Sequence, residues 1–247
     1  MNTTLKQYGS HISRRFNSEL EQLRSEVMRM GGKAEQALAK AVKSVTSGDS
    51  EMGLKIARTD RKINKLEVRI DEECSRILAT RSPAATDLRL VVAVIKAITD
   101  LERIGDESRR IGSLASDMAI GDPSQVYLVE LKTLGQHVQN QLRNSLDAFS
   151  RMDADDAVRV IEDDIVVDDE YEAIMEKSLS RMMENSDQVK LLVDVTWIAR
   201  ALERIGDHAK NIAEYVIYMV HGKDVRHTKL KKIQKEFGEE AAGDRGD

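Results

Sequence analysis

The sequence has few of the residues that interrupt helices or cross-link a chain. Its 247 residues include two prolines and one cysteine, Cys74, and aromatic residues make up only 4 %. Scarce proline leaves nearly the whole chain free of the strongest helix breaker. A lone cysteine excludes an intramolecular disulfide. Because aromatic rings are so rare, the core must consist mainly of aliphatic and methionine side chains.

Long apolar runs and an excess of basic residues are also missing. No stretch approaches the roughly 18 apolar residues that a membrane-spanning helix needs, and the polar segment 1–9 does not resemble a signal peptide. The formal net charge is −5, whereas nucleic-acid-binding proteins are usually basic. We therefore expect a cytoplasmic protein that makes no direct contact with nucleic acid.

One hexamer, Leu-Glu-Arg-Ile-Gly-Asp, occurs twice, at 101–106 and at 202–207. The copies are 101 residues apart. An identical motif at this distance indicates two copies of one structural unit. The repeat therefore predicts either two domains or one domain with internal pseudo-symmetry.

Apolar residues recur at helical spacing along nearly the whole chain. They predict six long helices, at 17–47, 50–80, 85–120, 124–151, 153–184 and 187–221. The sharpest break is Gly121-Asp122-Pro123, close to the middle. Short connections favour antiparallel neighbours. We predict an all-α fold of two tandem three-helix bundles, 1–121 and 122–228, followed by a disordered tail at 229–247.

Each hexamer places two carboxylates on one face of a helix. Glu102 and Asp106 are four residues apart, as are Glu203 and Asp207. Like charges at this spacing destabilise a helix by roughly 0.2–0.5 kcal/mol. A repeated arrangement that lowers stability suggests a bound cation.

Acidic residues on the preceding helices could complete such a site. The second predicted helix carries a row of polar residues at helical spacing, namely Asp60, Asn64, Glu67 and Asp71. The fifth carries a further carboxylate pair, Asp164 and Asp168. In an antiparallel bundle, two facing pairs surround one point with oxygen atoms. Oxygen donors suit magnesium, manganese and iron better than zinc.

A second interpretation of the acidic pairs is a solvated helix face offset by neighbouring arginines. Arg103 and Arg204 lie beside the two pairs. The sequence has no Glu-x-x-His pattern of the kind found in di-iron bundles and no phosphate loop or nucleophile elbow. The residues alone leave the cation site and the solvated face both open.

Several segments together resemble the PhoU family of phosphate-specific transport system accessory proteins. Two of them are the hexamers with the residue before each, at 100–106 and 201–207. The others are HISRRFNSEL at 11–20, SPAATDLRL at 82–90 and VDDEY at 167–171. The resemblance extends over about residues 9 to 228. It implies two three-helix bundles, in agreement with the periodicity.

The resemblance also implies a function. PhoU-like proteins are cytoplasmic negative regulators of the phosphate-starvation response and of phosphate uptake, and they are not enzymes. They are thought to couple the ATPase of a phosphate ABC transporter to a membrane sensor histidine kinase. The resemblance thus implies these two partners, a homodimer, and membrane association only through partners.

Some family members hold metal at the acidic motifs, as an iron or zinc cluster, and magnesium or manganese has been implicated too. Carried over to this sequence, the ligand positions are Asp60, Asn64, Glu102, Asp106, Asp164, Asp168, Glu203 and Asp207. Asn64 stands where the full motif has a carboxylate, so we expect weaker binding in the first bundle unless Glu67 compensates.

Two other functions remain as alternatives. The first is a carboxylate-bridged di-metal enzyme built in a helical bundle, which the missing Glu-x-x-His disfavours. The second is a structural helical scaffold whose acidic rows are merely solvated.

Overall fold

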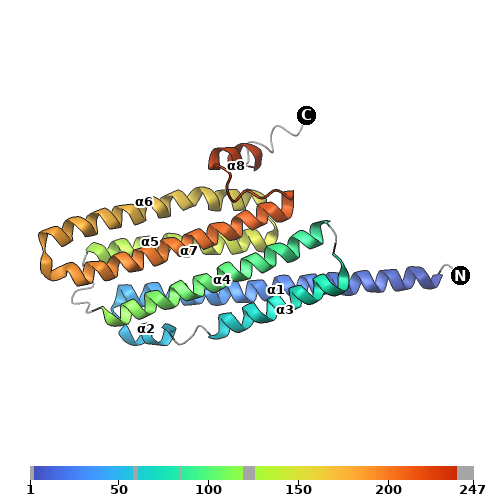
Figure 1. The fold of residues 1–247 in the computed structure, drawn as a ribbon, viewed down its shortest axis with the longest axis horizontal. Coiled ribbons are helices and arrows are strands. Elements are labelled where there is room, and N and C mark those ends of the chain that lie inside the picture. The colour runs from blue at the N-terminus through green and yellow to red at the C-terminus, as the bar shows by residue number, and fades with distance from the viewer. Residues whose placement is uncertain (1–2, 58–60, 84, 119–125, 238–247) are drawn as a thin grey trace.

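The computed structural model of the protein describes residues 3–57, 61–83, 85–118 and 126–237 (Figure 1). Over these residues the chain is helical and contains no β-strand, which confirms the predicted all-α class. The helices are α1 (Thr3–Ser47), α2 (Ser50–Ala57), α3 (Arg61–Arg81), α4 (Ala85–Asp117), α5 (Val126–Arg151), α6 (Ala154–Glu184), α7 (Val189–His221) and α8 (Leu230–Phe237), with a 3₁₀ turn at Ser186–Gln188.

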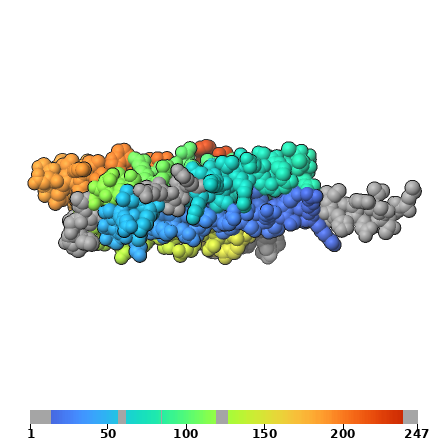
Figure 2. All heavy atoms as spheres, turned by 90° about the horizontal axis from the view of Figure 1, so that it is seen from below, coloured from blue at the N-terminus to red at the C-terminus, as the bar shows by residue number. Residues whose placement is uncertain are grey.

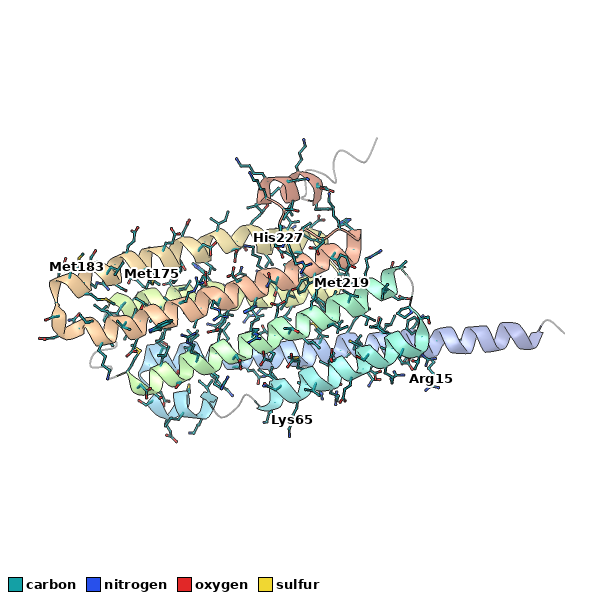
Figure 3. All side chains as sticks on the ribbon, viewed as in Figure 1. Arg15, Lys65, Met175, Met183, Met219 and His227 are labelled. Carbon is teal, nitrogen blue, oxygen red and sulfur yellow. The ribbon has the colours of Figure 1, made fainter. Side chains whose placement is uncertain are left out.

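The six long helices lie roughly along one axis and make an elongated molecule (Figures 1 and 2). Helices α1, α3 and α4 form one group, and α5, α6 and α7 form the other. Helices α4 and α7 pack against each other in the middle, so each hexamer lies on a central helix. Side chains fill the space between the helices (Figure 3). The buried apolar side chains of both groups form one continuous core, because each amphipathic helix must bury its apolar stripe against a neighbour.

Local signals end the helices where the sequence predicts. Gly48 and Gly222 adopt positive φ angles of 66° and 73° directly after α1 and α7, a backbone conformation that glycine reaches without steric cost. Asp153 caps α6, and its carboxylate accepts a hydrogen bond from the backbone N–H of Asp156 at 3.0 Å.

Three predictions about helix extent need correction. The first helix, expected at 17–47, already begins at Thr3. The single helix expected at 50–80 is divided into α2 and α3, and residues 58–60 between them lie outside the described part. The disordered tail predicted from 229 onward is wrong for residues 230–237, which form α8. Two apolar residues of α8, Ile233 and Phe237, are buried, and Gln234 donates a hydrogen bond to Glu162 on α6. The amphipathic stripe of this short helix is what attaches it to the bundle.

Three further predictions concern the domain boundary, membrane-spanning helices and Cys74. The break at 121–123 lies outside the described residues, so the division into 1–121 and 122–228 stays a prediction. No described helix is long and apolar enough to cross a bilayer. Cys74 is fully buried on α3, and burial raises the pKa of its thiol to about 12, which makes it an inert core residue.

Candidate metal centre

The acidic residues of the second half surround Asp164, which lies on α6 and faces α7. Its side chain is almost completely buried, at 2 % exposure. One carboxylate oxygen accepts a hydrogen bond of 2.9 Å from the amide of Gln141 on α5. The other lies 2.5 Å from the ammonium nitrogen of Lys210 on α7. Three helices therefore converge on this one carboxylate.

The other three predicted carboxylates of this half act electrostatically on one another and on Asp164. Asp168 is exposed, but partial desolvation by the surrounding protein raises the pKa of its carboxyl group, and the negative charges of Asp164 and Asp207 raise it further. Glu203 is buried, and Asp207 is exposed. Desolvation and then the charge of Asp207 raise the pKa of Glu203, while desolvation and then the charge of Asp164 raise that of Asp207. The structure thus brings together the four residues that the sequence predicts for the second site.

Two buried oxygen atoms at this cluster have no hydrogen-bond partner among the described residues. One is Oε2 of Glu203, whose other oxygen accepts a 2.7 Å hydrogen bond from Arg200. The second is Oε1 of Gln141, a residue that is only 3 % exposed. Leaving a buried acceptor unsatisfied costs about 1–3 kcal/mol. These oxygens are therefore suited to a cation.

Gly206 gives the neighbouring helices room to approach the cluster. A Cβ atom at this position would lie 2.9 Å from Oε1 of Gln141 and 3.1 Å from Cγ1 of Val167. It would also lie 3.8 Å from Oδ1 of Asp164. The glycine in the second hexamer is thus explained by close side chains from α5 and α6.

Lys210 supplies positive charge to the cluster. Burial alone would lower the pKa of its ammonium group, but the hydrogen bond and charge of Asp164 raise it overall. As the side chains stand, the described residues contain no group of three or more His, Cys, Asp or Glu side chains arranged to hold a metal ion. An ion that bound Asp164 would have to take the place of this ammonium group.

In the first half, the corresponding acidic residues lie on α3 and α4. Burial raises the pKa of Glu67, and the charges of Glu102, Asp71 and Asp106 raise it further. Glu67 of α3 therefore faces both hexamer carboxylates of α4. Asp106 also accepts a hydrogen bond of 2.8 Å from Arg109.

Of the two remaining predicted ligands of the first half, one lies in the described part of the chain and the other does not. Asn64 lies on α3 and is half-buried. Asp60 lies outside the described residues. The described first cluster thus comprises Glu67 and the three carboxylates whose charges act on it, Asp71, Glu102 and Asp106.

The hexamers also join the two halves through the contact between α4 and α7. Arg204 forms an ion pair with Glu107 of α4, with 2.8 Å between nitrogen and oxygen, although it lies beside the acidic pair in the sequence. A ring nitrogen of His208 lies 2.7 Å from Asp100, a buried residue of α4 that also accepts a hydrogen bond from Asn211. His208, an isolated imidazole in the sequence, is therefore part of the interface between the halves.

Two residues of the second cluster, Lys210 and Gln141, are not among those predicted from the sequence. Lys210 could have been found, because it lies three residues after Asp207 and so shares its helix face. Gln141 gives no such signal, since its position beside Asp164 depends on the register in which α5 packs against α6.

Comparison with known proteins gives one consistent result. The family model described as "PhoU domain" matches twice, at residues 27–115 and 131–216. The phosphate-specific transport system accessory protein PhoU homolog of Pseudomonas putida is 44 % identical over 95 % of this chain and 91 % of its own length. The PhoU accessory protein of Escherichia coli is 43 % identical, over 91 % of this chain and 93 % of its own.

A solved structure agrees with these sequence matches. The crystal structure of PhoU from Pseudomonas aeruginosa superposes with a TM-score of 0.81 at 42 % identity. It covers 84 % of this chain, and the match includes 100 % of that protein. Each matched family segment contains one hexamer and its facing acidic helix.

Proposed function

This chain belongs to the PhoU family, and we propose on that premise that it is a cytoplasmic negative regulator of phosphate uptake and of the phosphate-starvation response. The supporting observation is the match over more than nine-tenths of the chain to relatives named as accessory proteins of the phosphate-specific transport system. In this role it couples the ATPase of a phosphate ABC transporter to a sensor histidine kinase, acts as a homodimer and catalyses no reaction.

The carboxylate clusters are, in this proposal, metal sites that control the regulator. For the second half, the fit rests on the two buried oxygens without hydrogen-bond partners, Glu203 Oε2 and Gln141 Oε1. Asp164, Asp168 and Asp207 supply the charge. An entering divalent ion replaces the ammonium group of Lys210 at Asp164.

The donor set bears on which metal is held. All candidate ligands offer oxygen, which suits manganese, magnesium or iron, while zinc usually takes nitrogen or sulfur as well. In the first half, Glu67 compensates for the amide of Asn64, so that Glu67, Glu102 and Asp106 provide three carboxylates. Asp60 completes that ligand set in the proposal.

A reporter of the phosphate-starvation response tests this function. Cells that lack the gene are complemented with the wild type, with a variant in which Glu203 and Asp207 are both changed to Ala, or with Asp169→Asn as an exposed control on α6. We expect the wild type and the control to silence the reporter at high phosphate and the double variant to fail. Immunoblots establish that all three proteins accumulate.

The outcomes separate the regulatory role from the metal sites. A reporter that stays active with the wild type would refute the regulatory role itself. Silencing by the double variant would remove the second cluster from regulation and leave the family role intact. Equilibrium dialysis against Mn²⁺, Fe²⁺ and Zn²⁺ then identifies the bound ion, and the absence of binding in all three would favour a solvated acidic face.

A further inference from the structure

A small cavity lined by cationic side chains lies in the first half, beside the hexamer of α4. Its volume is about 110 Å³. Lys33 and Lys40 line it from α1, Lys62 from α3 and Arg109 from α4. Four positive charges on three helices therefore border one small space.

Negative charge at this cavity is sparse. No Asp or Glu is among the described lining residues, and the three lysines form no ion pair with a carboxylate in the described part of the chain. Arg109 donates a hydrogen bond of 2.8 Å to Asp106, so its charge is at least partly balanced by that carboxylate. The three lysines, with no carboxylate among the described lining residues, leave positive charge at the cavity, which favours an anion.

The walls and the size of the cavity restrict the anion. Ile56 and Ile63 are buried apolar residues that form part of the wall, while the amide of Gln36 adds a hydrogen-bonding group. Pockets for drug-sized ligands typically measure about 300–1,000 Å³, so a cavity of about 110 Å³ suits a small ion and excludes a whole nucleotide. Lysine ammonium groups bind compact oxyanions as point charges.

We propose that this cavity binds a small tetrahedral oxyanion of the phosphate class. Lys33, Lys40 and Lys62 supply charge and N–H donors from two helices, and Gln36 adds an amide donor. The site differs from the carboxylate clusters in both charge and ligand chemistry. It rests on the cavity alone and does not require the proposed regulatory function.

Titration of the full-length protein with inorganic phosphate tests the proposal. Isothermal calorimetry is carried out in the presence of EDTA, so that phosphate held through a metal at the carboxylates does not contribute. The variant carries Lys33→Gln and Lys40→Gln. A matched control carries Lys132→Gln and Lys190→Gln, two exposed lysines of the second half with the same change in net charge.

We expect the wild type and the control to bind phosphate with affinities within about twofold of each other, and the cavity variant to bind at least about tenfold more weakly. Circular dichroism checks that both variants remain helical. If the double variant unfolds, Lys62→Gln replaces it with the same expectation. No binding by the wild type, or equal weakening in the control, would overturn the proposal.

The source of the phosphate group is resolved by a second ligand. Glycerol 3-phosphate carries the same group on a larger molecule, which the cavity volume should exclude. We expect it to bind at least about tenfold more weakly than inorganic phosphate. Equal or tighter binding would overturn the assignment of a free ion and indicate a phosphorylated metabolite or protein.

Discussion

The ammonium nitrogen of Lys210 on α7 lies 2.5 Å from Oδ2 of Asp164, a buried carboxylate on α6. A buried carboxylate without a compensating charge is unfavourable by several kcal/mol. Around this pair, three more carboxylates repel one another. Lys210 is therefore a counter-ion within the second cluster, and a metal ion would have to compete with it for Asp164.

Removal of this counter-ion should destabilise the protein. We expect Lys210→Gln to lower the free energy of unfolding by about 2–3 kcal/mol, since it leaves Asp164 buried without its ion pair. Lys190→Gln, an exposed lysine on the same helix, should change it by less than about 0.5 kcal/mol. Urea denaturation measures both values. Equal stabilities of the two variants would show that the ion pair does not stabilise the fold.

Neutralising one repelled carboxylate should have opposite effects on stability and on metal binding. Asp207→Asn removes a charge that the neighbouring carboxylates repel, so we expect the metal-free protein to gain about 0.5 kcal/mol. Its affinity for Mn²⁺ should fall at least about tenfold, because a ligand is lost. Asp169→Asn is the control for both measurements. Unchanged Mn²⁺ affinity in Asp207→Asn would exclude this residue as a ligand.

Two glycine substitutions separate helix propensity from packing. Gly32→Ala should stabilise the protein by roughly 0.5–1 kcal/mol, because no atom beyond the local helix backbone lies within 4 Å of the added methyl group. Gly206→Ala gains the same propensity but places a methyl group against Gln141 and Val167. We expect a net loss of about 1–3 kcal/mol. Thermal unfolding of both variants is the measurement, and stabilisation by Gly206→Ala would contradict the observed close packing.

Glu214 should make stability depend on pH. Burial raises the pKa of this carboxyl on α7 from 4.5 to about 7. Between these two pH values the folded protein keeps a proton that the unfolded chain releases, so stability falls as the pH rises. Replacement by Gln removes this dependence.

The test compares Glu214→Gln with the wild type at pH 5 and at pH 8. We expect the stability of the variant relative to the wild type to increase with pH, by up to about 3 kcal/mol, since one pKa unit corresponds to about 1.4 kcal/mol. Urea denaturation at the two pH values provides the comparison. A difference that is constant with pH would show that Glu214 titrates normally in the folded protein.

Much of the fold follows from local sequence signals. The apolar spacing predicts the long helices, and Gly48, Asp153 and Gly222 mark helix ends through backbone and capping preferences that act within a few residues. The short helix α8 is missed because its apolar stripe, Leu230, Ile233 and Phe237, spans only two turns within a Lys-rich segment. Only contact with α6 and α7 shows that Ile233 and Phe237 are buried.

Some features of the candidate site also follow from the sequence, and others follow only from the tertiary structure. The sequence by itself determined which carboxylates share a helix face, because residues four apart lie on one side of a helix, and the duplicated hexamer indicated two such sites. Only the tertiary structure decided that Gln141 and Lys210 contact Asp164, that Arg204 and His208 pair with α4, and that four cations border one cavity. Those contacts depend on the register and rotation with which separate helices pack, and these are fixed by the whole core and not by any one segment.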